Sequence, residues 1–216
     1  MPGPKQERAQ KTREEILRAA AEVFDERGYH GAGMREIMKR AGVTLGAVYF
    51  HFPNKEALAQ AVMHEQPATI VPSLRSEGLQ RLVDITLVWS HKLQSDPLLR
   101  AGVRLTSEQT GYGFDDVTPY RQWAQIMEEC LVDGLAAGDV RTDADVPALA
   151  EFLVAACTGI QAYSLLASGR EDLPERARTM WRLIMPAIAT PHAAAGIDVS
   201  EAREAAVNGL TAGSGR

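Results

Sequence analysis

Residues 34–52 read MREIMKRAGVTLGAVYFHF, and their spacing decides the fold. A short helix is expected over 34–40, a turn at Gly42, and a second short helix over 45–50 with Thr44 as its N-cap. Two short helices joined by a glycine-containing turn are typical of a helix-turn-helix unit. Because the turn is tight, we expect Gly42 to stand where a side chain would clash. The small core of this unit is expected to contain Ile37, Met38, Ala41, Val43 and Val48.

The rest of the chain shows helical periodicity and no sustained alternation of the kind found in strands, so the expected fold class is all-α. A first helix is expected over 7–27, with Gly28 as its left-handed cap. A fourth helix begins at Lys55 behind the N-cap Asn54 and ends before Pro67. The remaining helices are expected near 77–94, 97–109, 118–137, 146–168 and 173–189.

These elements divide the chain into three expected parts. Residues 1–53 form an N-terminal three-helix domain that contains the helix-turn-helix and binds DNA. Residues 54–192 form a C-terminal helical bundle for ligand binding and dimerisation. Residues 193–216 are rich in alanine, glycine and serine, so we expect a flexible tail.

The composition is that of a soluble globular protein, because 45% of the 216 residues are apolar and 24% are charged. No run approaches the roughly 18 consecutive apolar residues of a membrane span, and the N-terminus lacks the apolar core of a signal peptide. The two cysteines, Cys130 and Cys157, lie inside expected helices, which indicates a reduced chain without a disulfide framework. We therefore expect a cytoplasmic protein with no membrane partner.

Charge is distributed unevenly along the chain. The whole chain carries a net charge of -5, but residues 1–55 carry +3 and residues 56–216 carry -8. A basic head on an acidic body is expected when only one end of a protein meets phosphate, although a solvated basic face gives the same pattern.

The second helix of the unit, over 45–50, has an exposed surface suited to a DNA groove. Small residues at Gly46 and Ala47 let the backbone approach the base edges, while Tyr49 and His51 offer polar groups to phosphate oxygens. The alternative is a plain helical hairpin with an aromatic core. The run over 49–52 counts against it, since four such residues cannot all face inward on one short helix. The residues expected to contact DNA are Arg35, Thr44, Leu45, Gly46, Ala47, Tyr49, His51 and Lys55.

Residues 41–58, which read AGVTLGAVYFHFPNKEAL, closely resemble the signature of the TetR family of repressors. The resemblance extends upstream through 12–17, 20–24 and the Gly28-Tyr29 pair. It implies an all-helical protein with an N-terminal DNA-binding domain and a C-terminal domain for ligand binding and dimerisation. Many relatives carry lysine where this chain has Leu45. Leucine can touch a thymine methyl but not a phosphate, so the operator sequence does not carry over.

The body is similar to the γ-butyrolactone receptors of antibiotic-producing actinomycetes in the runs over 97–106, 152–161 and 180–186 and at Trp123. This resemblance implies a lactone or butenolide effector in an apolar pocket with a few polar groups, and no cofactor. Trp123 would wall that pocket, and Gln66 would report its occupancy to the head. The expected ligand-binding residues are Gln66, Trp89, Trp123, Cys130, Val154, Thr158 and Tyr163, each of which could instead be ordinary core.

The helices over 146–168 and 173–189 carry broad apolar faces. They predict a four-helix interface of a homodimer, or else they close the bundle of a single chain. A dimer is favoured because two heads reading half-sites roughly 34–36 Å apart bind a palindromic operator far better than one head. The residues expected on these apolar faces are Val154, Ile160, Leu165, Leu166, Met180, Leu183, Ile184 and Ile188.

Two other functions are alternatives to a lactone-responsive repressor. The first is a TetR-type repressor of an efflux pump that senses drugs or lipophilic metabolites. It would need carboxylates such as Asp84 or Glu151 in the pocket, whereas a solvated helix face is their expected place. The second is an enzyme, for which the chain shows no G-x-S-x-G, H-E-x-x-H or phosphate-binding glycine loop. Its five histidines lack metal-ligand spacing, so neither a catalytic nor a metal site is expected.

Overall fold

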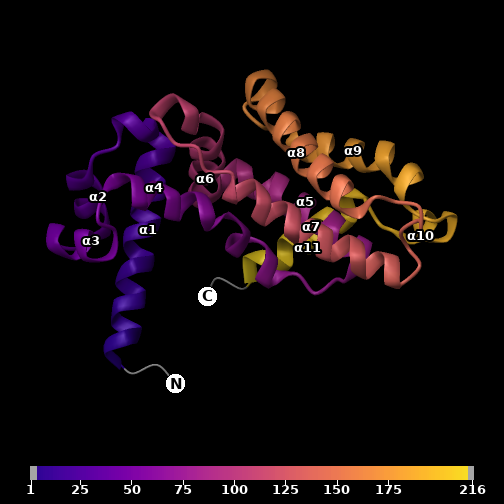
Figure 1. Ribbon diagram of the computed structural model, residues 1–216, viewed down its shortest axis with the longest axis horizontal. Coiled ribbons are helices and arrows are strands. Elements are labelled where there is room, and N and C mark those ends of the chain that lie inside the picture. The colour runs from indigo at the N-terminus through magenta and orange to yellow at the C-terminus, as the bar shows by residue number, and fades with distance from the viewer. Residues whose placement is uncertain (1–3, 214–216) are drawn as a thin grey trace. The chain divides into compact units, whose positions relative to one another are not determined.

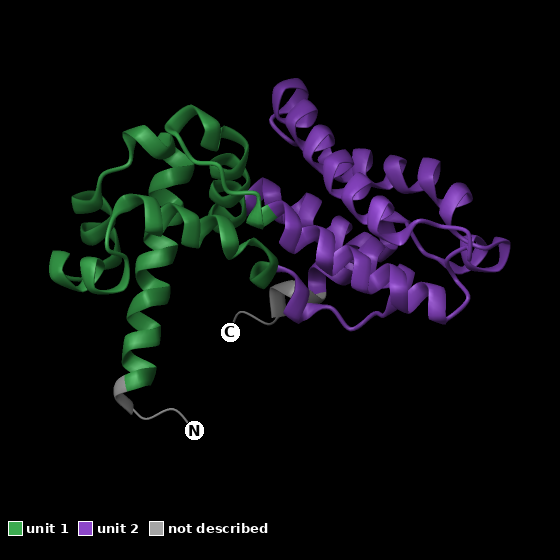
Figure 2. Ribbon diagram, in the orientation of Figure 1, with its two compact units in different colours: residues 1–69, 96–119 green, residues 70–95, 120–216 purple. Residues whose placement is uncertain are grey.

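The computed structural model describes residues 4–213, and these residues form helices and loops with no β-strand. They fall into two compact units, drawn in green and purple in Figure 2. The first unit comprises residues 1–69 and 96–119, and the second comprises residues 70–95 and 120–216. The all-α prediction is confirmed, and Figure 1 labels the helices.

The first unit is built around a long helix, α1, with three short helices packed beside it. Helix α1 spans Pro4–Gly31, but Gly28 inside it has φ of 66°, so the regular helix ends there as predicted. The others are α2 (Met34–Ala41), α3 (Leu45–His51) and α4 (Lys55–His64). Their shared core holds fully buried residues from all four helices, among them Ile16, Phe24, Ile37, Val48 and Leu58.

Helix α6 (Pro97–Glu108) also belongs to the first unit, although it lies far along the chain. The guanidinium of Arg100 pairs with the carboxylate of Asp25 on α1 at 2.5 Å. Arg104 donates to the Asp25 carbonyl at 2.9 Å and lies against Gly28, where a Cβ would come within 2.8 Å of its guanidinium. These contacts join α6 to α1, and α4 contributes Leu58 to the shared core, so the compact units do not follow the predicted division at 53/54.

An aromatic cluster completes the packing of the first unit. Tyr29 stacks on Tyr112 with ring centroids 4.5 Å apart and meets Phe114 edge to face at 5.0 Å. Tyr112 lies in the short helix η3 (Gln109–Tyr112), and its ring is partly buried. Burial raises the pKa of Tyr112 well above its usual value. The cluster joins the segment after α6 to the end of α1.

The second unit is a bundle of longer helices. It contains α5 (Gly78–Ser95), α7 (Thr118–Ala136), α8 (Val146–Ser168) and α9 (Leu173–Ile188). Their bounds agree with the predicted ranges to within a residue or two, because prolines and aspartate N-caps mark several of their starts. At its centre the fully buried Trp181 donates its indole N–H to Thr86 Oγ1 at 2.6 Å.

The prediction of a flexible tail from 193 onward is wrong for the residues that the structure describes. They form α10 (Pro191–Gly196) and α11 (Glu201–Gly213), and α11 packs on α5. Two side chains of α11, Arg203 and Glu204, form ion pairs with the bundle. An alanine-rich composition is as suitable for a helix as for a loose segment, and the buried partners of these two residues could not be seen in the sequence.

Within the described part of the chain, α8 is long and apolar enough to cross a membrane by length and composition. A core helix of a soluble protein passes the same test, so this property alone does not indicate a membrane.

Candidate functional site

The helix-turn-helix is formed by α2, α3 and the turn between them. Gly42 ends α2 in the left-handed region with φ of 68°, and its N–H bonds to the carbonyls of Met38 and Lys39. Thr44 caps α3 by accepting a hydrogen bond from Ala47 N at 3.2 Å. A Cβ on Gly42 would meet no atom within 4 Å, so the predicted clash is wrong. Glycine is needed here for its positive φ.

Helix α3 turns Val48 into the core and leaves the opposite side open. Gly46, Tyr49 and Phe50 are exposed, whereas Leu45, Ala47 and His51 are partly covered. Gly46, Tyr49 and Phe50 are spaced i, i+3 and i+4, so they form one stripe along the helix. We call these three residues the α3 stripe.

Most of the residues expected to contact DNA lie on or beside this stripe. Thr44 and Arg35 are exposed near the starts of α3 and α2. Arg8 and Lys11, on the N-terminal half of α1, are exposed as well. These positions provide exposed polar and cationic groups on the same unit as the uncharged α3 stripe.

Lys55 does not point outward as a phosphate contact would require. Its ammonium donates to the Ala32 carbonyl at 2.9 Å and lies 4.5 Å from the centre of the Tyr29 ring. Burial lowers the pKa of Lys55. The side chain therefore joins the start of α4 to the end of α1, a role that sequence spacing could not distinguish from phosphate binding.

Phe50 is absent from the expected DNA contacts, yet it is 80% exposed. A helical projection could have identified it, because Val48 faces the core and Phe50 lies two residues, or about 200°, further around the helix. The prediction that the aromatic run over 49–52 cannot all face inward is confirmed. Phe52 is buried in the core, and Phe50 and Tyr49 face outward.

The expected ligand-binding residues divide into three groups. Trp89, Trp123, Cys130 and Val154 are buried in the second unit on α5, α7 and α8. Burial raises the pKa of the Cys130 thiol to about 11, so it is an inert apolar group at neutral pH. All four side chains therefore lie in the interior of the second unit.

Thr158 and Tyr163 lie on the outer part of α8. The hydroxyl of Thr158 donates to the Val154 carbonyl at 2.8 Å, so its hydrogen bond is already satisfied within the helix. Tyr163 is 62% exposed, and the guanidinium of Arg176 lies 4.3 Å from its ring centre. Tyr163 thus lies at the surface, not inside the bundle.

Gln66 is buried in the first unit at the start of the short helix η1 (Gln66–Thr69). Its amide donates to the Met63 carbonyl at 2.8 Å and to Thr106 Oγ1 on α6 at 3.2 Å. Gly102 on α6 makes room for it, since a Cβ there would come within 2.5 Å of Gln66 Cγ. Gln66 therefore joins the end of α4 to α6.

Gln122, next to Trp123, was not predicted. Its Oε1 is buried and accepts no hydrogen bond from any residue in the described part of the chain. Because such acceptors are nearly always satisfied, this oxygen is a candidate contact for a ligand or water. No residue pattern distinguished it from a surface glutamine.

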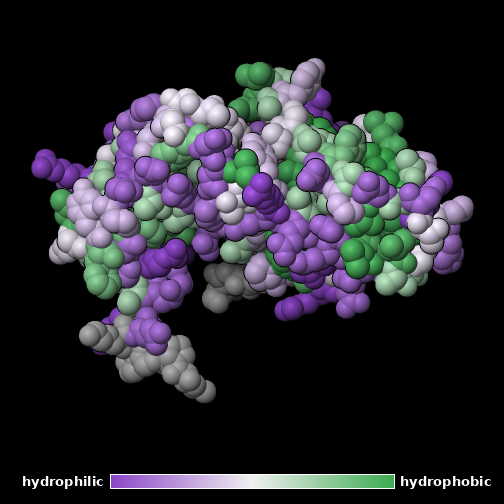
Figure 3. All heavy atoms as spheres, viewed as in Figure 1, coloured by the Kyte–Doolittle hydropathy of each residue, from purple (hydrophilic) through white to green (hydrophobic). Residues whose placement is uncertain are grey.

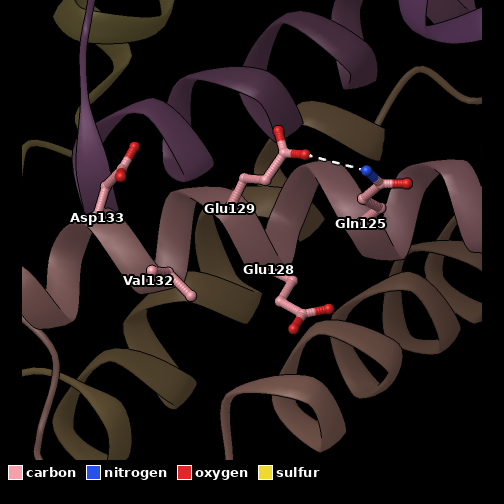
Figure 4. A pocket seen from close by; sticks show the side chains of 5 residues that line it. All are labelled: Gln125, Glu128, Glu129, Val132 and Asp133. Carbon is pink, nitrogen blue, oxygen red and sulfur yellow. Dashed lines mark hydrogen bonds between the residues drawn. The ribbon is translucent and has the colours of Figure 1, made fainter.

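A pocket of about 420 Å³ lies on the surface of α7 and contains none of the expected ligand residues. Figure 4 shows Glu128, Glu129 and Asp133 beside Val132, with Gln125 donating to Glu129. Its lining from a single helix is acidic and does not have the apolar walls expected for a lactone.

The two carboxylates of the drug-sensing alternative do not line the pocket on α7. Glu151 is exposed, as expected for a solvated face. Asp84 is fully buried, so the expectation of a solvated face is wrong for it. Its carboxylate pairs with Arg203 and accepts hydrogen bonds from Ser76 and Gln80.

Comparison with known proteins covers both units. Residues 16–62 match the family described as bacterial regulatory proteins, tetR family, and residues 76–190 match the tetracyclin repressor-like C-terminal domain. The A-factor receptor protein of Streptomyces griseus is 42% identical over 87% of this chain and 67% of its own length. The chain belongs to the TetR family of bacterial regulatory proteins.

Solved structures of TetR regulators have the same fold. TylP from Streptomyces fradiae is 40% identical, with a TM-score of 0.84 over 96% of this chain and 93% of its own. CprB from Streptomyces coelicolor, solved in complex with its biological operator sequence, is 31% identical, with a TM-score of 0.62 over 95% of this chain and 97% of its own. The resemblance inferred from the helix-turn-helix and the body is confirmed.

TetR-family regulators bind DNA operators, dimerise and bind small molecules. In this TetR chain, α8 and α9 expose large apolar side chains that a dimer interface would cover (Figure 3). Leu166 is 90% exposed and Leu183 is 75% exposed. Three of the residues expected on these faces are instead buried within the unit, namely Val154, Met180 and Ile188.

Proposed function

We propose that this protein is a ligand-responsive transcriptional repressor. It binds a palindromic operator as a homodimer, and a γ-butyrolactone or butenolide releases it, which switches on genes for antibiotics or other secondary metabolites. The observation that carries the proposal is the 42% identity to a protein named A-factor receptor, which extends through the body as well as the head. The protein would act in the cytoplasm and would not be an enzyme.

The DNA-binding part of the proposal is supported by the geometry of α3. A helix of seven residues is about 10 Å long, and it is narrow enough to enter a major groove about 12 Å wide. Its exposed stripe contains glycine at position 46, where the backbone can approach closely. Arg35, Thr44, Leu45, Ala47 and His51 surround the stripe and remain proposed DNA contacts.

Dimerisation is supported by the apolar surface of α8 and α9. Exposed leucines on two adjacent helices are costly in water, and each fully covered side chain contributes about 1.5–3 kcal/mol. A two-fold interface would bring the same surface of a second copy against them. Tyr163, which the structure places on this surface, fits the interface better than the ligand pocket.

The ligand part of the proposal depends on the interior of the second unit. Trp123, Trp89, Cys130 and Val154 offer apolar surface, and the unsatisfied Gln122 Oε1 offers an acceptor for a ligand hydroxyl. A small, largely apolar lactone suits such a lining. Ligand can release DNA only if it binds better to a state in which the two heads no longer match the operator.

Gln66 is proposed to act inside the head by holding α4 to α6. If the effector moves α6, the buried hydrogen bonds of Gln66 would transmit that movement to α4 and so to the helix-turn-helix. Gln66→Ala should then weaken the effect of ligand on DNA affinity more than it weakens DNA affinity itself.

A band-shift experiment tests the function directly. Duplexes selected from a random library by the purified protein are mixed with it, with and without synthetic A-factor or a butenolide. The proposal expects a shifted palindromic duplex whose band is lost on adding one of these compounds, with Trp123→Ala insensitive to the compound. A duplex that stays bound under every lactone and butenolide would refute the ligand, and failure to select any palindrome would refute the repressor.

No contact in the described residues favours the efflux-pump alternative. Asp84 is already neutralised by Arg203, and Glu151 is exposed, so neither presents a free carboxylate to a cationic drug inside the bundle.

A further inference from the structure

The exposed surface of α3 has an unusual chemistry for a helix that reads DNA. Between Arg40 and Asn54 the chain has no lysine, arginine, asparagine, glutamine, aspartate or glutamate. Arginine and lysine read guanine, and asparagine and glutamine read adenine, through paired hydrogen bonds in the major groove. Helix α3 cannot form those pairs with any side chain.

The α3 stripe instead ends in an aromatic ring. Phe50 is 80% exposed, and its ring has an edge contact with His51 at 5.1 Å between centroids. The exposed Phe50 is not needed for the core, which Val48 and Phe52 fill on the other side. Water contact makes this position unfavourable unless a partner covers it.

The residues around Phe50 indicate which partner covers it. Gly46 lies one turn before Phe50 on the same face, and a Cβ there would meet only Thr44 Oγ1 at 3.9 Å. No side chain therefore projects from the helix at the position next to the ring. The same unit exposes basic residues on α1 and α2. An uncharged helix surface in a unit that also exposes basic side chains fits a DNA groove better than a protein surface.

We propose that Phe50, together with Leu45 at the start of α3, reads the operator through the C5-methyl groups of thymine. The thymine methyl is the apolar feature that base pairs present in the major groove, so it is the feature that a phenylalanine ring can distinguish. Tyr49 contributes a hydroxyl to a phosphate, which positions the helix without specifying the sequence. This inference rests on the proposed function and names how its DNA site is recognised.

Uracil substitution separates this recognition from hydrogen bonding. Uracil keeps every hydrogen-bonding group of thymine and lacks the methyl, so one thymine at a time is replaced by deoxyuridine in the duplex selected by the wild-type protein. Burying one methyl is worth about a four-fold change in affinity. We expect about that loss per half-site at one or two thymines, measured by fluorescence anisotropy.

Measuring Phe50→Ala on the same thymine and uracil duplexes completes a double-mutant cycle. The variant should bind the thymine duplex about as weakly as the wild type binds the uracil duplex, and uracil at that position should cause no further loss. Phe50→Leu should keep part of the discrimination. Val117→Ala, which trims another exposed apolar residue of the same unit, should behave like the wild type. Circular dichroism should show an unchanged fold for each variant.

Four outcomes would overturn the inference. Tight DNA binding that no uracil weakens would refute methyl recognition and leave the proposed function standing. A uracil penalty that persists in Phe50→Ala and in Leu45→Ala would assign the methyl contact to other residues. A change in the oligomeric state of the DNA-free protein caused by Phe50→Ala would show that Phe50 contacts a second copy of the chain instead. Failure of the wild type to bind any duplex would refute this inference and the proposed function together.

Discussion

Single residues of the head have roles that differ from those that their type suggests. Gly42 is required for a positive φ, and Lys55 supports the domain from within instead of meeting phosphate. Gly46, in contrast, has a helical conformation and open space around it. No requirement of the free protein explains a glycine there, so its role is assigned to the bound state.

Gly46→Ala separates folding from DNA binding. Because alanine is a better helix former, the free energy of unfolding should rise by about 0.5–1 kcal/mol. DNA affinity should fall at least ten-fold, since the added methyl holds the backbone away from the bases. Urea unfolding and anisotropy measure the two quantities. Unchanged DNA affinity would show that α3 does not approach the groove along the α3 stripe.

Lys55→Met tests the structural role of that side chain. Loss of the hydrogen bond to Ala32 and of the contact with Tyr29 should lower the free energy of unfolding by about 1 kcal/mol. The dependence of DNA affinity on salt concentration should keep the wild-type slope. A slope lower by about one would instead mean that Lys55 neutralises a phosphate. Arg35→Met is the matched variant expected to lower the slope.

At the scale of elements, the C-terminal helix α11 is held to the bundle by charged side chains on successive residues. Arg203 pairs with Asp84 on α5, and Glu204 pairs with Arg178 on α9 and lies 2.6 Å from His91 Nε2. Asp84 and Glu204 are both buried. Breaking a buried pair is costly because the remaining charge has no partner, so these residues should fix α11 in place.

Asp84→Ala should lower the free energy of unfolding by about 3 kcal/mol. Hydrogen exchange should increase first in 201–209, because α11 loses its anchor on α5. Replacing both partners with Asp84→Leu and Arg203→Met should recover most of the stability. Asp143→Ala, which removes an exposed pair with Arg141, is the control and should change little. Unaltered exchange in α11 after Asp84→Ala would contradict the anchoring role.

The start of α9 makes stability depend on pH. Hydrogen bonds from Arg178 and then Arg182 lower the pKa of Glu175 from 4.5 to about 2. Its contribution is therefore complete above pH 4.5 and is lost as the pH falls toward 2. The difference in unfolding free energy between wild type and Glu175→Gln should be constant from pH 7 to 5 and shrink by pH 3.5. Since Glu175 is half exposed, this difference should stay below about 1 kcal/mol. A difference that is the same at pH 7 and 3.5 would show that the contacts are not ionic.

Local signals explain why the helices could be predicted and the pairing of distant elements could not. Caps such as Thr44 and Asn54 act on their neighbours, so the sequence shows them directly. The pairs of Asp25 with Arg100 and of Asp84 with Arg203 join residues 75 and 119 positions apart. No periodicity reports such a contact. The assignment of α6 to the head and the docking of α11 were missed for this reason.

The proposed function of the whole molecule depends on two surfaces, the α3 stripe on the first unit and the apolar face of α8 and α9 on the second. The sequence predicted the apolar faces of α8 and α9 from their amphipathic periodicity, and it predicted Gly46 and Tyr49 of the α3 stripe but not Phe50. It could not divide residues between core and surface on a helix that is apolar all round. Val154 is buried and Leu166 is exposed, although both are apolar residues of α8.

Leu166→Glu should separate the dimer into monomers. The exposed leucine does not support the core, so the fold should be retained, whereas a charge in the interface should raise the dimer dissociation constant at least ten-fold. Sedimentation velocity over a range of concentrations measures this change. Val132→Glu, at an exposed apolar position of α7, is the control. A Leu166→Glu protein that remains as tightly dimeric as the wild type would place the interface elsewhere.

The stoichiometry and ligand response of the DNA complex test the central claim most directly. A fluorescent palindromic duplex and its single half-site are titrated with the protein, and the mass of each complex is measured by sedimentation. We predict two chains on the palindrome, at least a hundred-fold weaker binding to the half-site, and return to free duplex when the lactone is added. One chain bound equally well to both duplexes, with no response to any lactone, would contradict the account.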